Sequence, residues 1–219
     1  MNKFVLGAVL LMVSLAGDRL VDGHGMLWDP AGRQSLWRFE EFKKYDPEPN
    51  FTDNQLFCGG FQHQWETQGG KCGICGDPFN EPSPRAHEGG GLYGKGIIAK
   101  TYKSGSKVNI TINLTAAHLG YFELKLCPHN NPLVPATQEC LDQYPLQLVD
   151  GSGSRFVPPN RAAHYVLHVQ LPQGVTCQQC VLQWHYNTGN SWGTDPDGSS
   201  GMGRGAQEVF RSCADIQIV

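Results

Sequence analysis

The sequence predicts an all-β fold, an antiparallel β-sandwich with long disulfide-stapled loops. Three observations lead to this prediction. Apolar and polar residues alternate with the period of a strand in several short segments of the second half, and no window has the pattern of a long, capped helix. Eight cysteines are spread along a chain that begins with an export signal. Short strands separated by Gly, Pro and Asn turns are typical of a sandwich.

The most regular alternation covers residues 108–115, which reads VNITINLT. Its apolar side chains share one face and its Asn and Thr side chains share the other, so one face is expected in the core and the other in solvent. The same pattern predicts strands in four further segments, residues 122–126, 165–171, 182–186 and 208–218.

Residues 28–95 have many Gly, Pro and aromatic residues and little periodicity. We expect long loops here, with a short helix around Ser35–Lys44. Loops of this length are usually functional.

The cysteines favour four disulfides, because their number is even and they follow an export signal. The sequence does not assign the pairing. The pairs Cys72/Cys75 and Cys177/Cys180 have the spacing of zinc knuckles. Their wide separation and the predicted export make disulfides the better interpretation. The cysteines are Cys58, Cys72, Cys75, Cys127, Cys140, Cys177, Cys180 and Cys213.

Residues 1–23 are predicted to be a signal peptide, because the charged start is followed by an apolar run, Phe4–Ala16, that is too short to span a bilayer. Two cleavage sites fit the local sequence, one after Gly23 and one after Ala16. Residues 24–219 are then a single secreted domain. Sequons at Asn50, Asn109 and Asn113 fit the same compartment.

The net charge of −3 argues against a nucleic-acid partner, since such proteins usually carry a basic surface. It is compatible with a neutral polymer. No second apolar run of spanning length follows the signal, so we expect no membrane partner, and we expect a monomer.

His24 is the strongest candidate metal ligand. Cleavage after Gly23 would make it the first residue, with its α-amine and imidazole Nδ1 both able to bind a metal. A second histidine would complete a plane of three nitrogens, which suits Cu(II). His118, just past the strand at 108–115, is the candidate, although an exposed histidine of no function is the alternative.

Glu208 and Phe210 are two residues apart on a predicted strand and share a face. A ring could close one axial side of a metal while a carboxylate lies beside it. The alternative is a core phenylalanine and a solvated glutamate.

Other histidines are weaker candidates. His164 and His168 lie on one strand face and could bind metal as a pair, but we expect both to be exposed. The sequence identifies no partner for His63, His87, His129 and His185. The glycine-rich segment 201–206 follows a loop instead of a strand, so it is not interpreted as a dinucleotide site.

Taken in order, six motifs make the mature chain resemble the lytic polysaccharide monooxygenases of auxiliary-activity family fifteen, found mainly in invertebrates. The resemblance covers the whole of residues 24–219. It is carried by HGML at His24 with RQSLWR at Arg33, GKCGICGDP at Gly70, PRAHE at Pro84, AAHLGYFE at Ala116, QWHYNTGNSWG at Gln183 and QEVFRSCAD at Gln207.

This resemblance implies an immunoglobulin-like or fibronectin-like sandwich that carries one copper ion. It implies cleavage between Gly23 and His24, and a histidine brace formed by His24 and His118. Phe210 would be the axial aromatic residue that does not ligate, Ala116 would crowd the other axial side, and Glu208 would lie beside the metal.

The resemblance further implies an external electron donor, O₂ or H₂O₂ as co-substrate, and oxidative cleavage of a β-1,4-linked crystalline polysaccharide. We expect chitin first and cellulose second, with oxidation at C1. Trp28, Trp37 and Tyr45 are candidates for stacking on sugar rings. The alternatives are a non-catalytic polysaccharide-binding or copper-carrying protein, and a secreted disulfide scaffold without metal.

Overall fold

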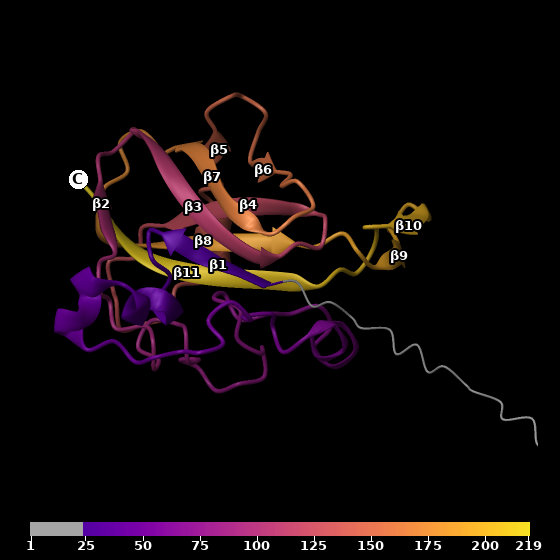
Figure 1. The fold of residues 1–219 in the computed structure, drawn as a ribbon, viewed down its shortest axis with the longest axis horizontal. Coiled ribbons are helices and arrows are strands. Elements are labelled where there is room, and N and C mark those ends of the chain that lie inside the picture. The colour runs from indigo at the N-terminus through magenta and orange to yellow at the C-terminus, as the bar shows by residue number, and fades with distance from the viewer. Residues whose placement is uncertain (1–23) are drawn as a thin grey trace, which may run out of the picture.

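The computed structural model describes residues 24–219, so the predicted signal peptide lies outside the described residues. Two sheets form the sandwich, and the segment between β1 and β2 packs beside β11 as a third, irregular layer (Figure 1). The first sheet has the order β1-β3-β7-β5 and the second β2-β11-β8-β4-β6, while β9 and β10 form a separate hairpin. The predicted sandwich is confirmed.

In the first sheet the strands are β1 (His24–Asp29), β3 (Lys107–Ala116), β7 (Ala163–Gln170) and β5 (Gln147–Leu148). All its pairs are antiparallel. The alternation predicted for 108–115 is confirmed, because four apolar side chains of β3 are buried: Val108, Ile110, Ile112 and Leu114.

In the second sheet the strands are β2 (Lys100–Tyr102), β11 (Val209–Ile218), β8 (Cys177–Asn187), β4 (Tyr121–Cys127) and β6 (Arg155–Phe156). The central strand β8 pairs antiparallel with both β4 and β11. The β11–β2 pair is parallel, a departure from the purely antiparallel expectation. The core between the sheets includes four large aromatic side chains, Phe122, Trp184, Tyr186 and Phe210.

The helix predicted around Ser35–Lys44 is instead two 3-10 helices, η1 (Arg33–Arg38) and η2 (Glu40–Tyr45). Phe39 separates them in an extended conformation, with φ −109° and ψ 131°. Its ring packs against Trp28 at 4.9 Å, so a tertiary contact accompanies the break in the helix. The remaining elements are η3 (His63–Thr67), a π-helical turn, α1 (Gln138–Asp142), β9 (Trp192–Thr194) and β10 (Ser200–Met202).

All the cysteines form disulfides, as predicted, in the pairs Cys58–Cys72, Cys75–Cys213, Cys127–Cys140 and Cys177–Cys180. The second of these joins the irregular layer to β11. A buried ion pair lies close by, where the Arg33 guanidinium donates to both Asp215 carboxylate oxygens at 2.8 and 2.6 Å. Together these links hold the irregular layer against the outer face of the second sheet.

The sequons differ in accessibility. Asn50 is buried: its Oδ1 accepts hydrogen bonds from the Thr52 backbone N–H and hydroxyl, and its Nδ2 lies 3.2 Å from His87 Nε2. A glycan on this nitrogen would displace the His87 contact. Asn109 is exposed on β3, and Asn113 is half-buried there.

His185 accepts a hydrogen bond at Nδ1 from Arg211 Nε at 3.2 Å on the covered face of the second sheet. Burial, with the positive charges of Arg211 and Lys125, holds the pKa of His185 well below its ordinary value. Burial also lowers the pKa of Arg211 to about 10. Protonation of His185 would therefore place a second cation in a buried site that already holds Arg211.

We predict that His185 makes folding stability sensitive to acid. His185 in the unfolded chain binds a proton near the ordinary pKa of 6.5, whereas in the folded chain it binds a proton only at a pH well below that value. The free energy of unfolding is therefore fully retained above that pKa and decreases as the pH falls below it. His185→Gln should show a smaller drop in melting temperature between about pH 7 and pH 5 than the parent. His168→Gln, on an exposed histidine, is the matched control and should behave as the parent. Equal drops in all three proteins would contradict the prediction.

Candidate metal centre

The pairing of β1 with β3 places His24 opposite Ala116, at the last residue of β3. The His24 carbonyl accepts a hydrogen bond from the Thr115 hydroxyl at 3.2 Å, and the Gly25 N–H donates to the Asn54 carbonyl at 2.9 Å. The backbone at the start of β1 is thus held from two sides. Ala116 presents only a methyl group next to His24.

Gly25 is required by the close approach of β1 to the core. A Cβ at this position would lie 2.8 Å from Cη2 of Trp184, a fully buried side chain. Any larger residue would push the start of β1, and therefore His24, away from the second sheet.

His118 lies in the turn after β3 and is only 7% exposed, so it is not the exposed histidine that the sequence left as the alternative. Its N–H donates to the Tyr186 hydroxyl at 2.8 Å, and its carbonyl accepts from the Gly189 N–H at 2.8 Å. The same hydroxyl donates to the Leu119 carbonyl at 2.7 Å. Burial raises the pKa of Tyr186 to about 12, so the hydroxyl stays protonated and keeps this turn in place.

Phe210 is buried on β11, and its ring centroid lies 6.3 Å from that of His24. Phe57 and Tyr186 hold the ring from other sides, at 6.1 and 5.9 Å. Phe210 is thus both a core residue and a neighbour of His24, so the two interpretations made from the sequence do not exclude each other.

Glu208 immediately precedes β11 and has a side chain that is 12% exposed. Its Oε2 lies 3.9 Å from Nδ1 of His118. Its carbonyl accepts hydrogen bonds from the N–H and hydroxyl of Thr188 at 3.0 and 3.1 Å. The carboxylate is therefore held beside His118 instead of being freely solvated.

These five residues, predicted from the sequence, meet at one end of the sandwich. Among the described residues, no three His, Cys, Asp or Glu side chains are grouped so that they could hold a metal. A metal held by His24 and His118 would therefore need a third protein donor from the main chain. The α-amine of His24 can supply it if the preceding peptide bond is cut, and the resulting set of nitrogens suits copper.

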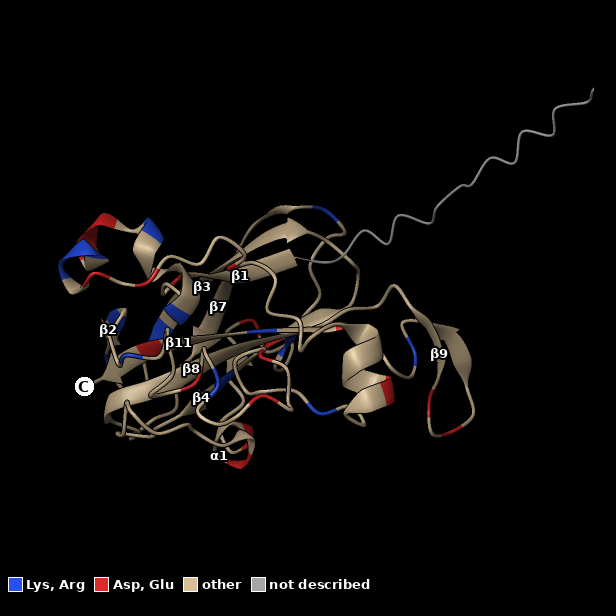
Figure 2. Ribbon diagram, turned by 90° about the horizontal axis from the view of Figure 1, so that it is seen from below, with Lys and Arg blue, Asp and Glu red and all other residues tan. Residues whose placement is uncertain are grey.

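The other predicted candidates lie elsewhere. His164 and His168 are exposed on β7, where His164 packs edge-on against Trp28 and Nδ1 of His168 lies 2.7 Å from Oδ1 of Asn109. β1 runs from the end near β9 and β10 toward the end where η1 and η2 lie (Figures 1 and 2). Trp28, Trp37 and Tyr45 therefore belong to the end away from His24.

The four histidines without a partner in the sequence analysis all have one in the structure. His63 contacts Asn80, His87 contacts Asp77, His129 contacts the Val134 carbonyl, and His185 contacts Arg211. His87 is buried, with Nδ1 2.6 Å from the Asp77 carboxylate and its ring stacked on Tyr93. These contacts join loops and strands, and none of them includes His24 or His118.

Two residues in contact with His118, and one exposed aromatic residue on β9, were missed from the sequence. Tyr186 positions the His118 backbone, Asn190 touches the His118 ring, and Trp192 on β9 is 71% exposed. The motif around Gln183–Gly193 contained all three, but strand periodicity gave no sign that Tyr186 and Asn190 contact His118.

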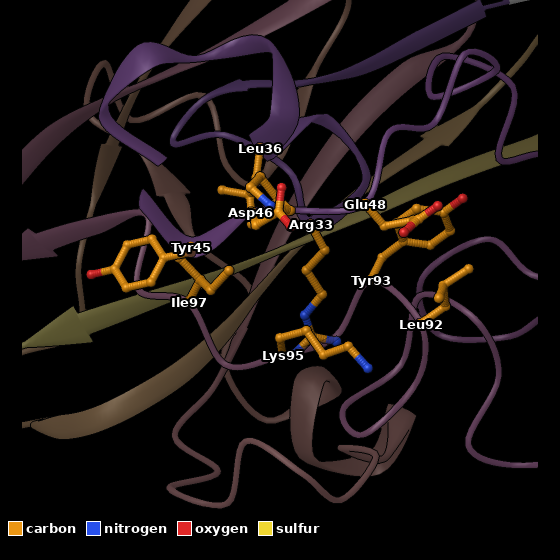
Figure 3. Close-up of a pocket in the computed structure, with 10 residues that line it drawn as sticks. Arg33, Leu36, Tyr45, Asp46, Glu48, Leu92, Tyr93, Lys95 and Ile97 are labelled. Atoms are coloured by element: carbon orange, nitrogen blue, oxygen red, sulfur yellow. The ribbon is translucent and has the colours of Figure 1, made fainter. Parts of the chain in front are cut away.

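A separate cavity of about 390 Å³ lies between η2 and the segment at residues 92–97 (Figure 3). Tyr45 and Tyr93 line it, and Arg33 crosses it. The Arg33 guanidinium is already bound by Asp215 and the His87 carbonyl. The cavity is at the η2 end of the molecule, so it is distinct from the candidate metal centre.

Known proteins resemble this chain in sequence and in fold. The family model described as "Lytic polysaccharide mono-oxygenase, cellulose-degrading" matches residues 24–216. A search of curated proteins finds no match. The chain is similar to the AA15 lytic polysaccharide monooxygenase of the insect Thermobia domestica in the Cu(I) state, with 49% identity and a TM-score of 0.85. That match covers 89% of this chain and 98% of the other.

The chain is also similar to LPMO10B of Micromonospora aurantiaca, with a TM-score of 0.50 over 89% of this chain and 99% of that one. At 14% identity this second likeness concerns the fold alone. The family-model match and the insect relative place the chain in a family of copper-dependent oxidoreductases, which use an external reductant and O₂ or H₂O₂ to act on polysaccharides. The chain therefore belongs to the lytic polysaccharide monooxygenases, and within them to the AA15 group.

Proposed function

We propose that the mature protein begins at His24 and binds one copper ion through the amine and imidazole of His24 and the imidazole of His118. The observation that carries this proposal is the β1–β3 register, which sets His24 against Ala116, two residues before His118. The family match also begins at His24. Bound copper would supply the one-electron chemistry with O₂ or H₂O₂.

The neighbouring side chains have separate roles in this proposal. With copper bound, Phe210 would lie beside it with a ring that has no oxygen to ligate, and the ring would keep water from that side. The Ala116 methyl, opposite His24, would limit the space beside the metal. Glu208 offers a carboxylate next to His118, where it can orient a hydrogen-bonded co-substrate or hold a proton. Preorganised polar groups of this kind act most strongly where water is excluded.

Chitin is the substrate that we propose first, with oxidation at C1. The hairpin β9–β10 begins two residues after Asn190, which contacts the His118 ring. It presents Trp192 and Met202 in one cross-strand pair, at 71% and 57% exposure. A ring can stack on a sugar face, and the acetamido methyl of chitin adds an apolar contact that cellulose lacks. Cellulose is the second candidate, because the matching family model is described as cellulose-degrading.

We also propose that the protein is secreted as a monomer and that residues 1–23 are its export signal. Four disulfides support an oxidising compartment. Among the residues that the structure describes, no helix has the length and apolarity needed to cross a membrane. Lys and Arg are interspersed with Asp and Glu in the charge view, consistent with an uncharged polymer as partner (Figure 2).

The role of His118 is tested by His118→Ala in protein that starts at His24. Loss of a ligand should weaken Cu(II) binding by at least about 100-fold, since loss of a group that merely supports a ligand already costs about 10–100-fold. Oxidised oligosaccharides should disappear from the products while chitin binding remains. His168→Ala, on exposed β7, is the matched control and should retain both properties. Unchanged product yield in His118→Ala would contradict the assignment, and chitin binding without copper in the parent would favour a binding module.

The substrate-facing role of the hairpin is tested by Trp192→Ala. Removing one anchoring aromatic side chain should weaken binding to crystalline chitin by about tenfold. Copper affinity should be unchanged. Phe51→Ala is the control, since Phe51 is 81% exposed but packs edge-on against Trp37 instead of lying on β9. Binding isotherms that are equal for the two variants would contradict this role.

A further inference from the structure

We propose that Asn190 is a positioning residue that fixes the His118 ring so that Nε2 faces the metal. This inference rests on the proposed function and adds to it a residue that no part of that proposal used. The contact that carries it joins Nδ2 of the Asn190 carboxamide to Nδ1 of His118, at 3.0 Å. The amide therefore contacts Nδ1, and Nε2 is the ring nitrogen that we assign to the metal.

The chemistry of imidazole makes this contact important. A neutral ring binds a metal through one nitrogen only, and its other nitrogen carries the proton and must donate it. Asn190 can serve as the acceptor, because a half-turn of its carboxamide places Oδ1 where Nδ2 lies, with almost no change in shape. Glu208 Oε2, at 3.9 Å, is a second oxygen near the same Nδ1. Acceptors at Nδ1 favour the tautomer in which Nε2 has a free lone pair.

Asn190 can fix the ring because its own backbone is held on both sides. On one side, the Gly189 N–H donates to the His118 carbonyl at 2.8 Å. On the other, the Ser191 N–H donates to Oε1 of Gln207 at 3.0 Å, and Nε2 of the same buried glutamine donates back to the Ser191 carbonyl at 3.0 Å. The carboxamide thus projects from a segment that is anchored to His118 and to the residue before Glu208.

This segment also leads directly into the hairpin. Trp192, the first residue of β9, is two residues beyond Asn190. The side chain that orients the metal ligand and the exposed ring proposed to meet the polysaccharide therefore belong to one short stretch of chain. A positioning role for Asn190 accounts for why this stretch is tied so closely to the His118 turn.

The test compares Asn190→Ala and Asn190→Asp in protein that starts at His24. Alanine removes the acceptor, and aspartate keeps one. We expect Asn190→Ala to weaken Cu(II) affinity, measured by competition with a chelator, by about 10–100-fold. We expect its Cu(II) spectrum to show an altered coupling of the remote imidazole nitrogen in pulsed electron paramagnetic resonance. Asn190→Asp should stay within about threefold of the parent and keep the parent spectrum.

Asn160→Ala is the matched control. Asn160 also contacts the His118 turn, where its Oδ1 accepts a hydrogen bond from the backbone N–H of Leu119 at 3.3 Å. It should leave copper affinity and the remote-nitrogen signal unchanged, and metal-free Asn190→Ala should melt at the parent temperature. Parent-like affinity and spectrum in Asn190→Ala would overturn this inference alone. Equal losses in Asn190→Ala and Asn190→Asp would overturn the acceptor role. A parent protein that does not bind copper tightly would overturn the proposed function and this inference with it.

Discussion

The antiparallel pairing of β1 with β3 is the constraint on which the candidate site depends. Chain termini are usually poorly ordered unless they are tied into a sheet. Here the first described residue, His24, already has a register partner in Ala116, and hydrogen bonds from Thr115 and to Asn54 hold the start of the strand. Gly25 lets the strand lie against Trp184 without a side chain between them. If the mature chain begins at His24, the α-amine of His24 would have a fixed position relative to Ala116.

The site is assembled from both sheets, so it exists only in the folded sandwich. His24 and Ala116 come from the first sheet, and Phe210 comes from the second. Tyr186 of β8 links the two, since its hydroxyl binds the His118 N–H while its ring lies 5.9 Å from that of Phe210. On the outer face of the second sheet, the Arg33–Asp215 pair and the Cys75–Cys213 disulfide hold the irregular layer in place. The position of β11, and hence of Phe210, is supported from both faces.

The strands with clear alternation were predictable, because a half-buried strand such as β3 shows its two faces directly in its sequence. β1 was not predicted as a strand. Its sequence, HGMLWD, has four adjacent positions, Gly25–Trp28, at which side-chain burial does not alternate with solvent exposure. The break at Phe39 is accompanied by a contact with Trp28, a residue that lies outside the segment predicted to be a helix. The burial of Asn50 against His87 is a tertiary contact that a sequon cannot reveal.

One part of the candidate site was also predictable from the sequence, and another part was not. His24, His118, Glu208 and Phe210 were candidates from their positions and spacing, and the motif resemblance added Ala116. The structure brings the five residues to one end, while their roles stay a proposal. Asn190 and Tyr186 act through contacts across turns, and such contacts have no periodic signal. The stacking candidates Trp28, Trp37 and Tyr45 were chosen for residue type alone, and they lie toward the η1–η2 end, whereas Trp192 lies on the hairpin that follows Asn190.

The most direct test of the account is a Cu(II) titration, read by electron paramagnetic resonance, of two proteins that differ by one residue. One begins at His24, and the other retains Gly23 and so has no free amine on His24. We predict tight one-to-one binding and a type-2 spectrum with several nitrogen ligands for the first. We predict that the second loses this spectrum and binds copper weakly. Equal binding by the two proteins, or weak binding by both, would contradict the claim that the mature N-terminus is a copper ligand.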